Sequence, residues 1–352
     1  MRKPSQAVDC GAVRDEGKVE AMKVDPSSTV SCHKLVFFGH SPNGDRRIRW
    51  LCWLVALGTV AASTVLELDA PGGRYTQTRV ASGGIATMVW NGAAGLRLSR
   101  CTDSACSAVS PAVTVPGTDP DPRFIRMELM DGGAPVLAYA AANDTEAHVT
   151  WCDDVVCSTS TTVVVARAQR IRHTDLAMLD TATGEVQVVV GTSDTTAKSG
   201  STLLAAHLAR GAILRSATIA EASAPFAINT TTGLPTGGLE MPALVVGASA
   251  ATSHVAYWDV VGRSLRLVLN AMSAHPRTLT VASAAASPAS PASAASADSS
   301  PGAWARAVRE EGSSLIVLAF FDLQAGSLLV ATCDDIAQTC TPPRQLDAVG
   351  HR

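Results

Sequence analysis

Aromatic residues and lysine are scarce in this sequence. Phe, Trp and Tyr make up 4% of the 352 residues, and beyond position 60 the only lysine is Lys198. The formal net charge is −3 at pH 7, and the arginines are scattered along the chain rather than clustered. A chain without a basic field is poorly suited to binding nucleic acid, so we expect no nucleic-acid partner.

The chain also lacks the common motifs of enzyme active sites. It contains no G-x-S-x-G, P-loop, dinucleotide-binding or H-E-x-x-H pattern, each of which ties a chemistry to a local structure. The Ser-x-Asp-x-Gly-x-x-Trp turn of sialidase-type propellers is absent as well. These absences make an enzyme less expected without excluding one, because catalytic residues scattered in sequence can converge on folding.

No metal or cofactor is predicted. The turn carboxylates, such as Asp119 and Asp121, match no calcium-binding pattern and are interpreted as solvated turns. Histidines with no metal-ligand spacing are more simply explained as hydrogen-bonded or exposed side chains. Four of them fall in or beside expected strands: His148, His173, His207 and His254.

Ala, Val, Thr, Ser and Gly are abundant, and they form five repeats of short β-rich runs separated by Gly, Asn or Asp turns. The second run of each repeat is nearly all apolar, as in Val136–Ala140, which fits a strand covered on both faces. Four antiparallel strands at a period of roughly 50–60 residues are typical of a propeller blade. We therefore predict an all-β protein, a β-propeller of about five (or six) four-stranded antiparallel blades, with Thr64–Leu68 as a further strand that would close the ring.

Six of the nine cysteines form three close pairs around an acidic turn. Strand partners that flank so short a loop lie at a separation a disulfide accepts, and the loop aspartate can cap backbone N–H groups. A four-thiolate zinc site is the competing interpretation for the first two pairs, although C-x2-C is the commoner zinc spacing. The predicted disulfides are Cys101–Cys106, Cys152–Cys157 and Cys333–Cys340.

The remaining cysteines, Cys10, Cys32 and Cys52, precede or lie in an apolar segment that follows Arg46-Arg47-Ile-Arg49. A basic stretch, an apolar core and a small-residue exit are typical of a signal peptide. We predict that residues 50–63 are a signal-peptide core or an uncleaved signal anchor, in which case residues 50–66 would hold the chain in a membrane. Residues 1–49 are then a disordered or cytoplasmic tail, or follow a start codon assigned too early, and residues 64–352 are the propeller domain.

The repeat, an Asp-Gly-like turn, a Pro-Val-Leu-Ala-Tyr-like strand and a Leu-x-Val-x-x-Cys-x-Asp-x-x-Cys run, resembles one in uncharacterised β-propeller-like proteins of bacterial and protist cell surfaces. The resemblance covers roughly residues 74–346 and is weakest in the third and fourth repeats, which lack the cysteines. It implies a fold and a compartment. It implies no catalytic residue, because the family carries no assigned activity.

Two kinds of surface feature accompany the repeats. Asn143 and Asn229 head N-x-Thr sequons in expected loops and are predicted to be glycosylated. Residues 284–301 form an Ala/Ser/Pro run that cannot pack a core, and we predict a low-complexity loop there. Aromatic residues that recur in the second strands are predicted to lie between blades rather than to form a sugar-binding platform.

The predicted protein is extracellular or on the cell surface, monomeric, and a binding or scaffold module that contacts a glycan or protein ligand with one rim, without evident catalysis. One alternative is a secreted carbohydrate-active propeller hydrolase or lyase with acid–base carboxylates at the channel mouth. Another is a membrane-anchored structural surface protein. Two or three carboxylates converging with an arginine in a pocket would favour the enzyme, and an apolar or narrow axis the binding module.

Overall fold

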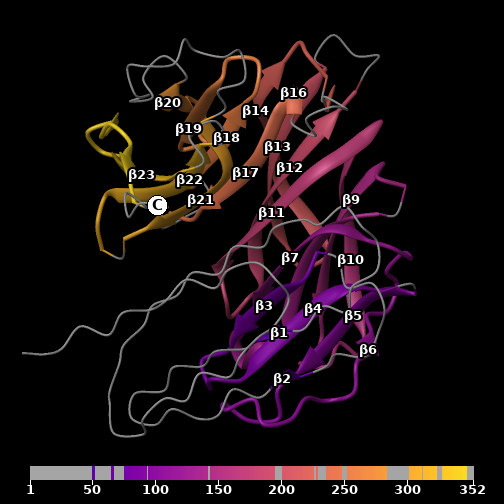
Figure 1. Ribbon diagram of the computed structural model, residues 1–352. Helices are drawn as coiled ribbons and strands as arrows, with labels where there is room; N and C mark the ends of the chain where they lie inside the picture. The colour runs from indigo at the N-terminus through magenta and orange to yellow at the C-terminus, as the bar shows by residue number, and fades with distance from the viewer. Residues whose placement is uncertain are drawn as a thin grey trace, which may run out of the picture. The chain divides into compact units, whose positions relative to one another are not determined.

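The computed structural model describes twelve stretches of the chain (Figure 1), namely residues 50–51, 65–66, 75–92, 94–141, 143–194, 200–225, 227–228, 235–247, 252–283, 301–310, 312–322 and 327–346. Within these stretches the only helical element is the 3₁₀ turn η1 (Asp131–Gly133), and all other regular structure is β-strand. No helix in the described part of the chain has the length and apolar character needed to cross a membrane.

Four antiparallel sheets of four strands and a fifth of five strands follow one another along the chain. The first four strands of each pair in sequence order, and the fifth strand of the last sheet pairs with its third. Sheet one comprises β3 (Gln77–Val80), β4 (Ala86–Gly92), β5 (Gly95–Arg100) and β6 (Val113–Thr114). Sheet two comprises β7 (Arg123–Leu129), β8 (Pro135–Ala140), β9 (Glu146–Cys152) and β10 (Ser160–Arg167). Sheet three comprises β11 (Arg170–Asp180), β12 (Glu185–Ser193), β13 (Ser201–Ala209) and β14 (Ala212–Ala222).

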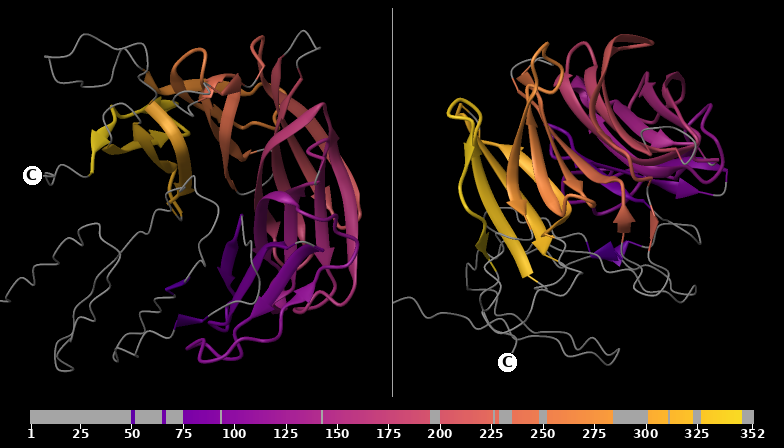
Figure 2. Two further views of the ribbon diagram at one scale, coloured as in Figure 1. Left: turned by 45° about the vertical axis from the view of Figure 1, so that its right-hand side comes forward. Right: turned by 90° about the horizontal axis from the view of Figure 1, so that it is seen from above.

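Sheet four comprises β17 (Leu239–Val245), β18 (His254–Asp259), β19 (Ser264–Leu269) and β20 (Arg277–Ser283). Sheet five comprises β21 (Pro301–Arg309), β22 (Leu315–Asp322), β23 (Ser327–Asp334), β24 (Thr339–Cys340) and β25 (Arg344–Gln345). A further small sheet pairs β15 (Ala227–Ile228) with β16 (Pro235–Gly237). Figure 2 shows these sheets from two more directions. The prediction of an all-β, propeller-like succession of four-stranded sheets is confirmed.

The last sheet departs from the expected pattern at its fourth strand. In place of one fourth strand, β24 and β25 each pair with β23 and are separated by Thr341-Pro342-Pro343. Proline has no backbone N–H to donate to the ladder, so the two prolines split the strand.

Several predicted segments lie outside the described residues. These are the tail 1–49, residues 52–63 of the predicted leader, the sequon at Asn229 and residues 284–300 of the predicted loop. β1 (Trp50–Leu51) and β2 (Val65–Leu66) are described, and neither joins one of the five larger sheets. The strand expected at Thr64–Leu68 is therefore present as β2, but not as part of a blade.

The core lies between consecutive sheets. Tyr139 packs with strands of sheets one and two, Tyr257 with sheets three and four, and Phe320 with sheets four and five. Each is at most 7% exposed, and burying a side chain of this kind stabilises by roughly 1.5–3 kcal/mol. Trp151, also buried, donates its indole N–H to the Gly184 carbonyl of the next sheet at 2.8 Å. The prediction for the second-strand aromatics is thus confirmed for Tyr139, Tyr257 and Phe320, whereas Trp90 packs in a cluster within sheet one.

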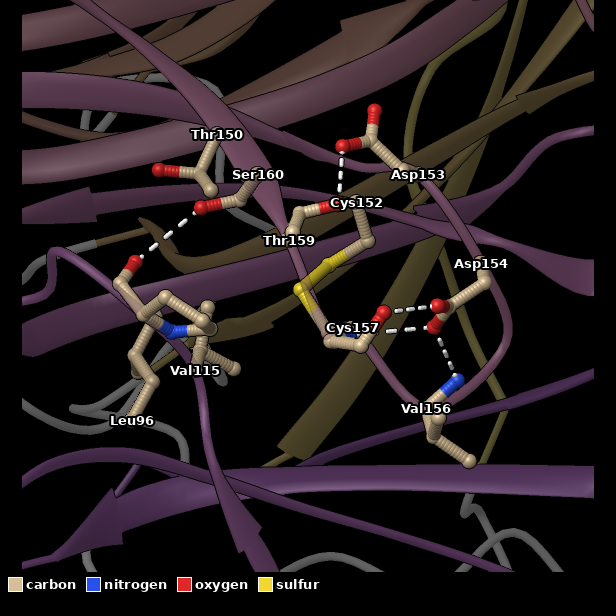
Figure 3. Close-up of a disulfide and its surroundings, with 12 residues drawn as sticks. Leu96, Val115, Thr150, Cys152, Asp153, Asp154, Val156, Cys157, Thr159 and Ser160 are labelled. Atoms are coloured by element: carbon tan, nitrogen blue, oxygen red, sulfur yellow. Dashed lines mark hydrogen bonds between the residues drawn. A yellow bond between two sulfur atoms is a disulfide. The ribbon is translucent and has the colours of Figure 1, made fainter.

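A disulfide joins each predicted cysteine pair, with Cα–Cα distances of 4.8 Å, 4.7 Å and 4.0 Å in chain order. Figure 3 shows Cys152–Cys157 beside Leu96 and Val115 of sheet one, and all four belong to one buried cluster. The bridge therefore contributes apolar surface to the packing between two sheets as well as closing its own loop. The loop is also capped, because the Asp154 carboxylate accepts the backbone N–H of Val156 at 3.0 Å.

Candidate functional site

A cavity of about 220 Å³ lies where the first strands of the sheets meet. The first strands β3, β7, β11, β17 and β21 contact one another in that order, so residues at corresponding positions of separate repeats converge there. The lining of the cavity comes from all five repeats and includes Tyr75, Phe124, Arg126, His173, Met241 and Arg306.

Irregular backbone shapes the wall of this pocket. The ladders of β7, β11 and β17 shift register next to the lining residues, between Arg123 and Arg126 in β7 for example. Tyr75, Phe124 and Met241 have φ angles of 55°, 53° and 49°, a left-handed conformation that is costly for residues other than glycine. A β-bulge re-aims the side chain that it carries. Backbone strain of this kind concentrates at functional sites, so the three strained lining residues favour a functional role for the pocket.

An aromatic row forms part of the wall. The rings of Tyr75 and Phe124 have centroids 5.3 Å apart, and those of Phe124 and His173 are 5.2 Å apart, both pairs tilted. Tyr75 is 41% exposed. The row thus runs from solvent to His173 and offers apolar ring surface next to polar groups.

His173 pairs with the carboxylate of Glu240, which lies in the first strand of sheet four. The imidazole Nε2 is hydrogen-bonded to Glu240 Oε2, and the Glu240 side chain is 2% exposed compared with 21% for His173. The carboxylate accepts the Nε2 proton, so the neutral ring carries its lone pair on Nδ1. Among the described residues Nδ1 has no hydrogen-bond partner, and this atom is therefore able to take a proton from a bound molecule.

Asp175 connects three sheets. Its Oδ1 accepts the Nε–H of Arg126 at 2.9 Å, and its Oδ2 accepts the backbone N–H of Leu244 at 2.7 Å. A second cross-sheet pair joins Arg79 to Glu128 at 2.8 Å. Burial opposes the charge of Arg79, but the hydrogen bond and charge of Glu128, with Asp175, outweigh it and raise the pKa of Arg79. Arg126, which lines the pocket, is thus neutralised by Asp175, whereas neither Arg79 nor Glu128 is among the lining residues.

Arg306 differs from these arginines. Its Nη1 donates to the Ala305 carbonyl at 3.1 Å, and no carboxylate of the described residues lies within ion-pair distance of it. The side chain remains solvent-accessible, yet the protein around it lowers its pKa, first by desolvation and then through the positive charges of Arg126 and Arg79, with Asp175 opposing.

The other histidines and the described sequon lie elsewhere. His148 pairs with Glu146 at 3.0 Å, and His207 with Glu185 at 3.2 Å. Asn143 is exposed in a turn, where its Oδ1 accepts the Thr145 N–H at 3.1 Å, and Asn229 is not among the described residues. His254 is buried, and its Nδ1 accepts the N–H of Asn270 at 3.1 Å. Of the four histidines considered from the sequence, only His173 lines the pocket.

No three or more His, Cys, Asp or Glu side chains gather into a plausible metal site within the described stretches. No catalytic residue and no pocket were predicted from the sequence. A signal was present, because Arg74-Tyr75, Arg123-Phe124 and Arg172-His173 recur 49 residues apart at the heads of three repeats. An arginine followed by a ring in that register marks the position at which the first strands converge.

No family model matches the chain, and no curated protein matches it. Among solved structures it is similar to an endo-arabinase from Bacteroides thetaiotaomicron VPI-5482, at 11% identity and a TM-score of 0.38, over 77% of this chain and 92% of that one. It is similar to a PL25 ulvan lyase at 8% identity and a TM-score of 0.44, over 82% and 70%. A puromycin hydrolase matches at 11% identity and a TM-score of 0.37, over 80% and 47%. With every TM-score below 0.5, the choice of function depends on the pocket residues.

The prediction of a binding or scaffold module without catalysis is wrong. The similar structures include glycoside hydrolases and polysaccharide lyases, which match the alternative. None of the described residues that line the pocket is a carboxylate, but two carboxylates bind lining residues from outside the cavity, Asp175 at Arg126 and Glu240 at His173.

Proposed function

We propose that this protein is a secreted, carbohydrate-active propeller enzyme, a hydrolase or a lyase, and that the pocket at the first strands is its active site. The observation that carries the proposal is the pairing of His173 with the buried carboxylate of Glu240. A histidine oriented by a buried carboxylate, with its second ring nitrogen available, has the geometry of a general base. Glu240 is a positioning residue, since it acts through the imidazole.

The rest of the pocket is consistent with a sugar. Tyr75 and Phe124 present ring faces beside the polar groups of His173 and Arg126, and sugars bind to an apolar ring face combined with hydrogen-bonding groups at its edge. The cavity of about 220 Å³ is smaller than the roughly 300–1,000 Å³ of pockets for drug-sized ligands. One sugar unit of a longer chain is a suitable occupant.

Fold and compartment enter the proposal as well. The succession of four four-stranded sheets and one five-stranded sheet supports a five-bladed propeller, which we propose to be a monomer. Three disulfide-bonded hairpins support an oxidising, extracellular location, in line with the resemblance to cell-surface propeller proteins.

The test is turnover of a panel of neutral and acidic polysaccharides, with new reducing ends and the ultraviolet absorbance of unsaturated sugars as readouts. His173→Gln should lower the rate on the active polysaccharide by roughly 10²–10⁴-fold, the usual contribution of a general base. His207→Gln is the matched control, because His207 also pairs with a glutamate and has the same 21% side-chain exposure, but is outside the pocket. Full activity of His173→Gln, or no product from any polysaccharide, would refute the proposal.

A further inference from the structure

The charges of the pocket do not balance internally. Arg126 is matched by Asp175 at 2.9 Å, and Arg79 by Glu128 at 2.8 Å. Arg306 lines the same cavity, and its one hydrogen bond within the described stretches goes to the carbonyl of the preceding residue. One positive charge is left without a carboxylate partner, facing the space that the substrate would occupy.

The Arg306 side chain is exposed and lines the cavity together with Arg126. Desolvation and the positive charges of Arg126 and Arg79 lower its pKa, with Asp175 opposing. The charge therefore lacks a compensating partner next to it. A bound anion would supply that partner, and a planar carboxylate fits a guanidinium through two parallel hydrogen bonds.

We infer that the pocket selects a sugar that bears a carboxylate, a uronate unit of an acidic polysaccharide, and that Arg306 binds this carboxylate. The sugar part of the inference rests on the proposed function, whereas the anion part rests on Arg306 alone. Neutral glycans would leave the guanidinium unpaired, so they should bind more weakly.

A uronate would also decide between the two reaction classes. When the uronate carboxylate is bound to Arg306, the proton at C5 becomes more acidic. Loss of that proton leaves a negative charge that spreads onto the carboxylate, beside a fixed cation. His173 Nδ1 takes the C5 proton, the bond between C4 and the glycosidic oxygen breaks, and a double bond forms between C4 and C5. The leaving oxygen takes a proton from water, and the imidazolium returns its proton to solvent. The reaction is an elimination that needs no co-reactant.

The experiment measures binding separately from turnover. His173→Gln protein is titrated calorimetrically with trimers of galacturonate, glucuronate, mannuronate and guluronate, each compared with its fully methyl-esterified form. At least one ionised trimer should bind roughly 10–100-fold more tightly than its ester, the contribution of hydrogen bonds to a charged group. Adding Arg306→Gln should abolish that preference, and Arg306→Lys should retain part of it. Arg167→Gln is the control, because Arg167 is 72% exposed on the fourth strand of its sheet.

The outcomes separate the two proposals. Equal binding of ionised and esterified trimers, or an unchanged preference in the folded Arg306→Gln variant, would overturn the assignment of Arg306. Activity of the wild-type enzyme on a neutral polysaccharide would then leave the proposed function standing. Conversely, Arg306-dependent binding of a uronate trimer supports the inference even if the wild-type protein releases no product.

Discussion

Two regions of the repeats differ in how uniform their residues are. The hairpins of the third and fourth strands reuse one motif, whereas the ends of the first strands vary from repeat to repeat. At the hairpins, sheets one, two and five use the same solution, a short disulfide with an aspartate that caps the turn. At the first strands, corresponding positions carry different side chains, such as Arg126 in sheet two, Asp175 in sheet three and Arg306 in sheet five.

The difference in residue use follows from the contacts that each region makes. A hairpin is stabilised by contacts made within a few residues, so one motif can be reused in several repeats. The first strands meet the first strands of other sheets, so an identical charged residue in every repeat would place like charges together and repel. Arg126, Asp175 and Arg306 therefore share the corresponding positions with the uncharged Ala243, and this irregular set gives the pocket its chemistry.

The largest loss of stability is expected from Asp175→Ala. The substitution leaves Arg126 and the Leu244 N–H without their acceptor, and removing one partner of a partly buried pair should lower the free energy of unfolding by about 2–4 kcal/mol. Asp175→Asn should lose less, because an amide oxygen can still accept the Leu244 N–H. Urea unfolding followed by tryptophan fluorescence measures both. An ordinary surface substitution changes the free energy of unfolding by less than about 0.5 kcal/mol. If Asp175→Ala has no larger effect, this carboxylate does not hold the sheets together.

The same division explains what could be predicted from the sequence. Hairpins depend on neighbours in sequence, and the apolar run Val136–Ala140 lies within β8. Cysteine spacing and turn residues carry that information locally. Each cross-sheet pair of the pocket joins residues far apart, 49 positions for Arg126 and Asp175 and 67 for His173 and Glu240.

Spacing cannot reveal which distant residues meet. The bulges that aim Phe124 and Met241 depend on how a strand fits its partner, and no residue type announces them. An alignment of the repeats on their arginine-aromatic heads would have marked the location of the pocket, but not the ion pairs within it. In this protein the scaffold is largely a local property of the sequence, and the site is a property of the assembled sheets.

A smaller and purely structural effect is expected at a hairpin. Replacing Cys152 and Cys157 together by alanine removes a crosslink over a short loop, which should lower the free energy of unfolding by about 2 kcal/mol on loop-entropy grounds. Uronate binding at the pocket should be unchanged. Urea unfolding and calorimetry measure the two quantities, and non-reducing peptide mapping of the wild type should show the Cys152–Cys157 link. The equivalent change at Cys101 and Cys106 should cost about as much, because the loop has the same length. A folded variant that no longer binds the ligand would show that hairpin and pocket are coupled.

The smallest effect is expected at the turn inside that hairpin, and it depends on pH. Hydrogen bonds from Ser158, first its hydroxyl and then its backbone N–H, lower the pKa of Asp154 in the folded protein. A carboxyl whose pKa is lower in the folded state than in the unfolded state stabilises the fold above its unfolded value, about 3.9, and loses that contribution as the pH falls through the folded value. Asp154→Asn should therefore weaken the dependence of the melting temperature on pH below about pH 4.

Asp131→Asn is the control, because Asp131 is exposed and its side chain makes no hydrogen bond with the described residues. Turnover of the active polysaccharide should be the same for both variants, because neither Asp154 nor Asp131 lines the pocket; a rate that fell with Asp154→Asn alone would show that hairpin and pocket are coupled.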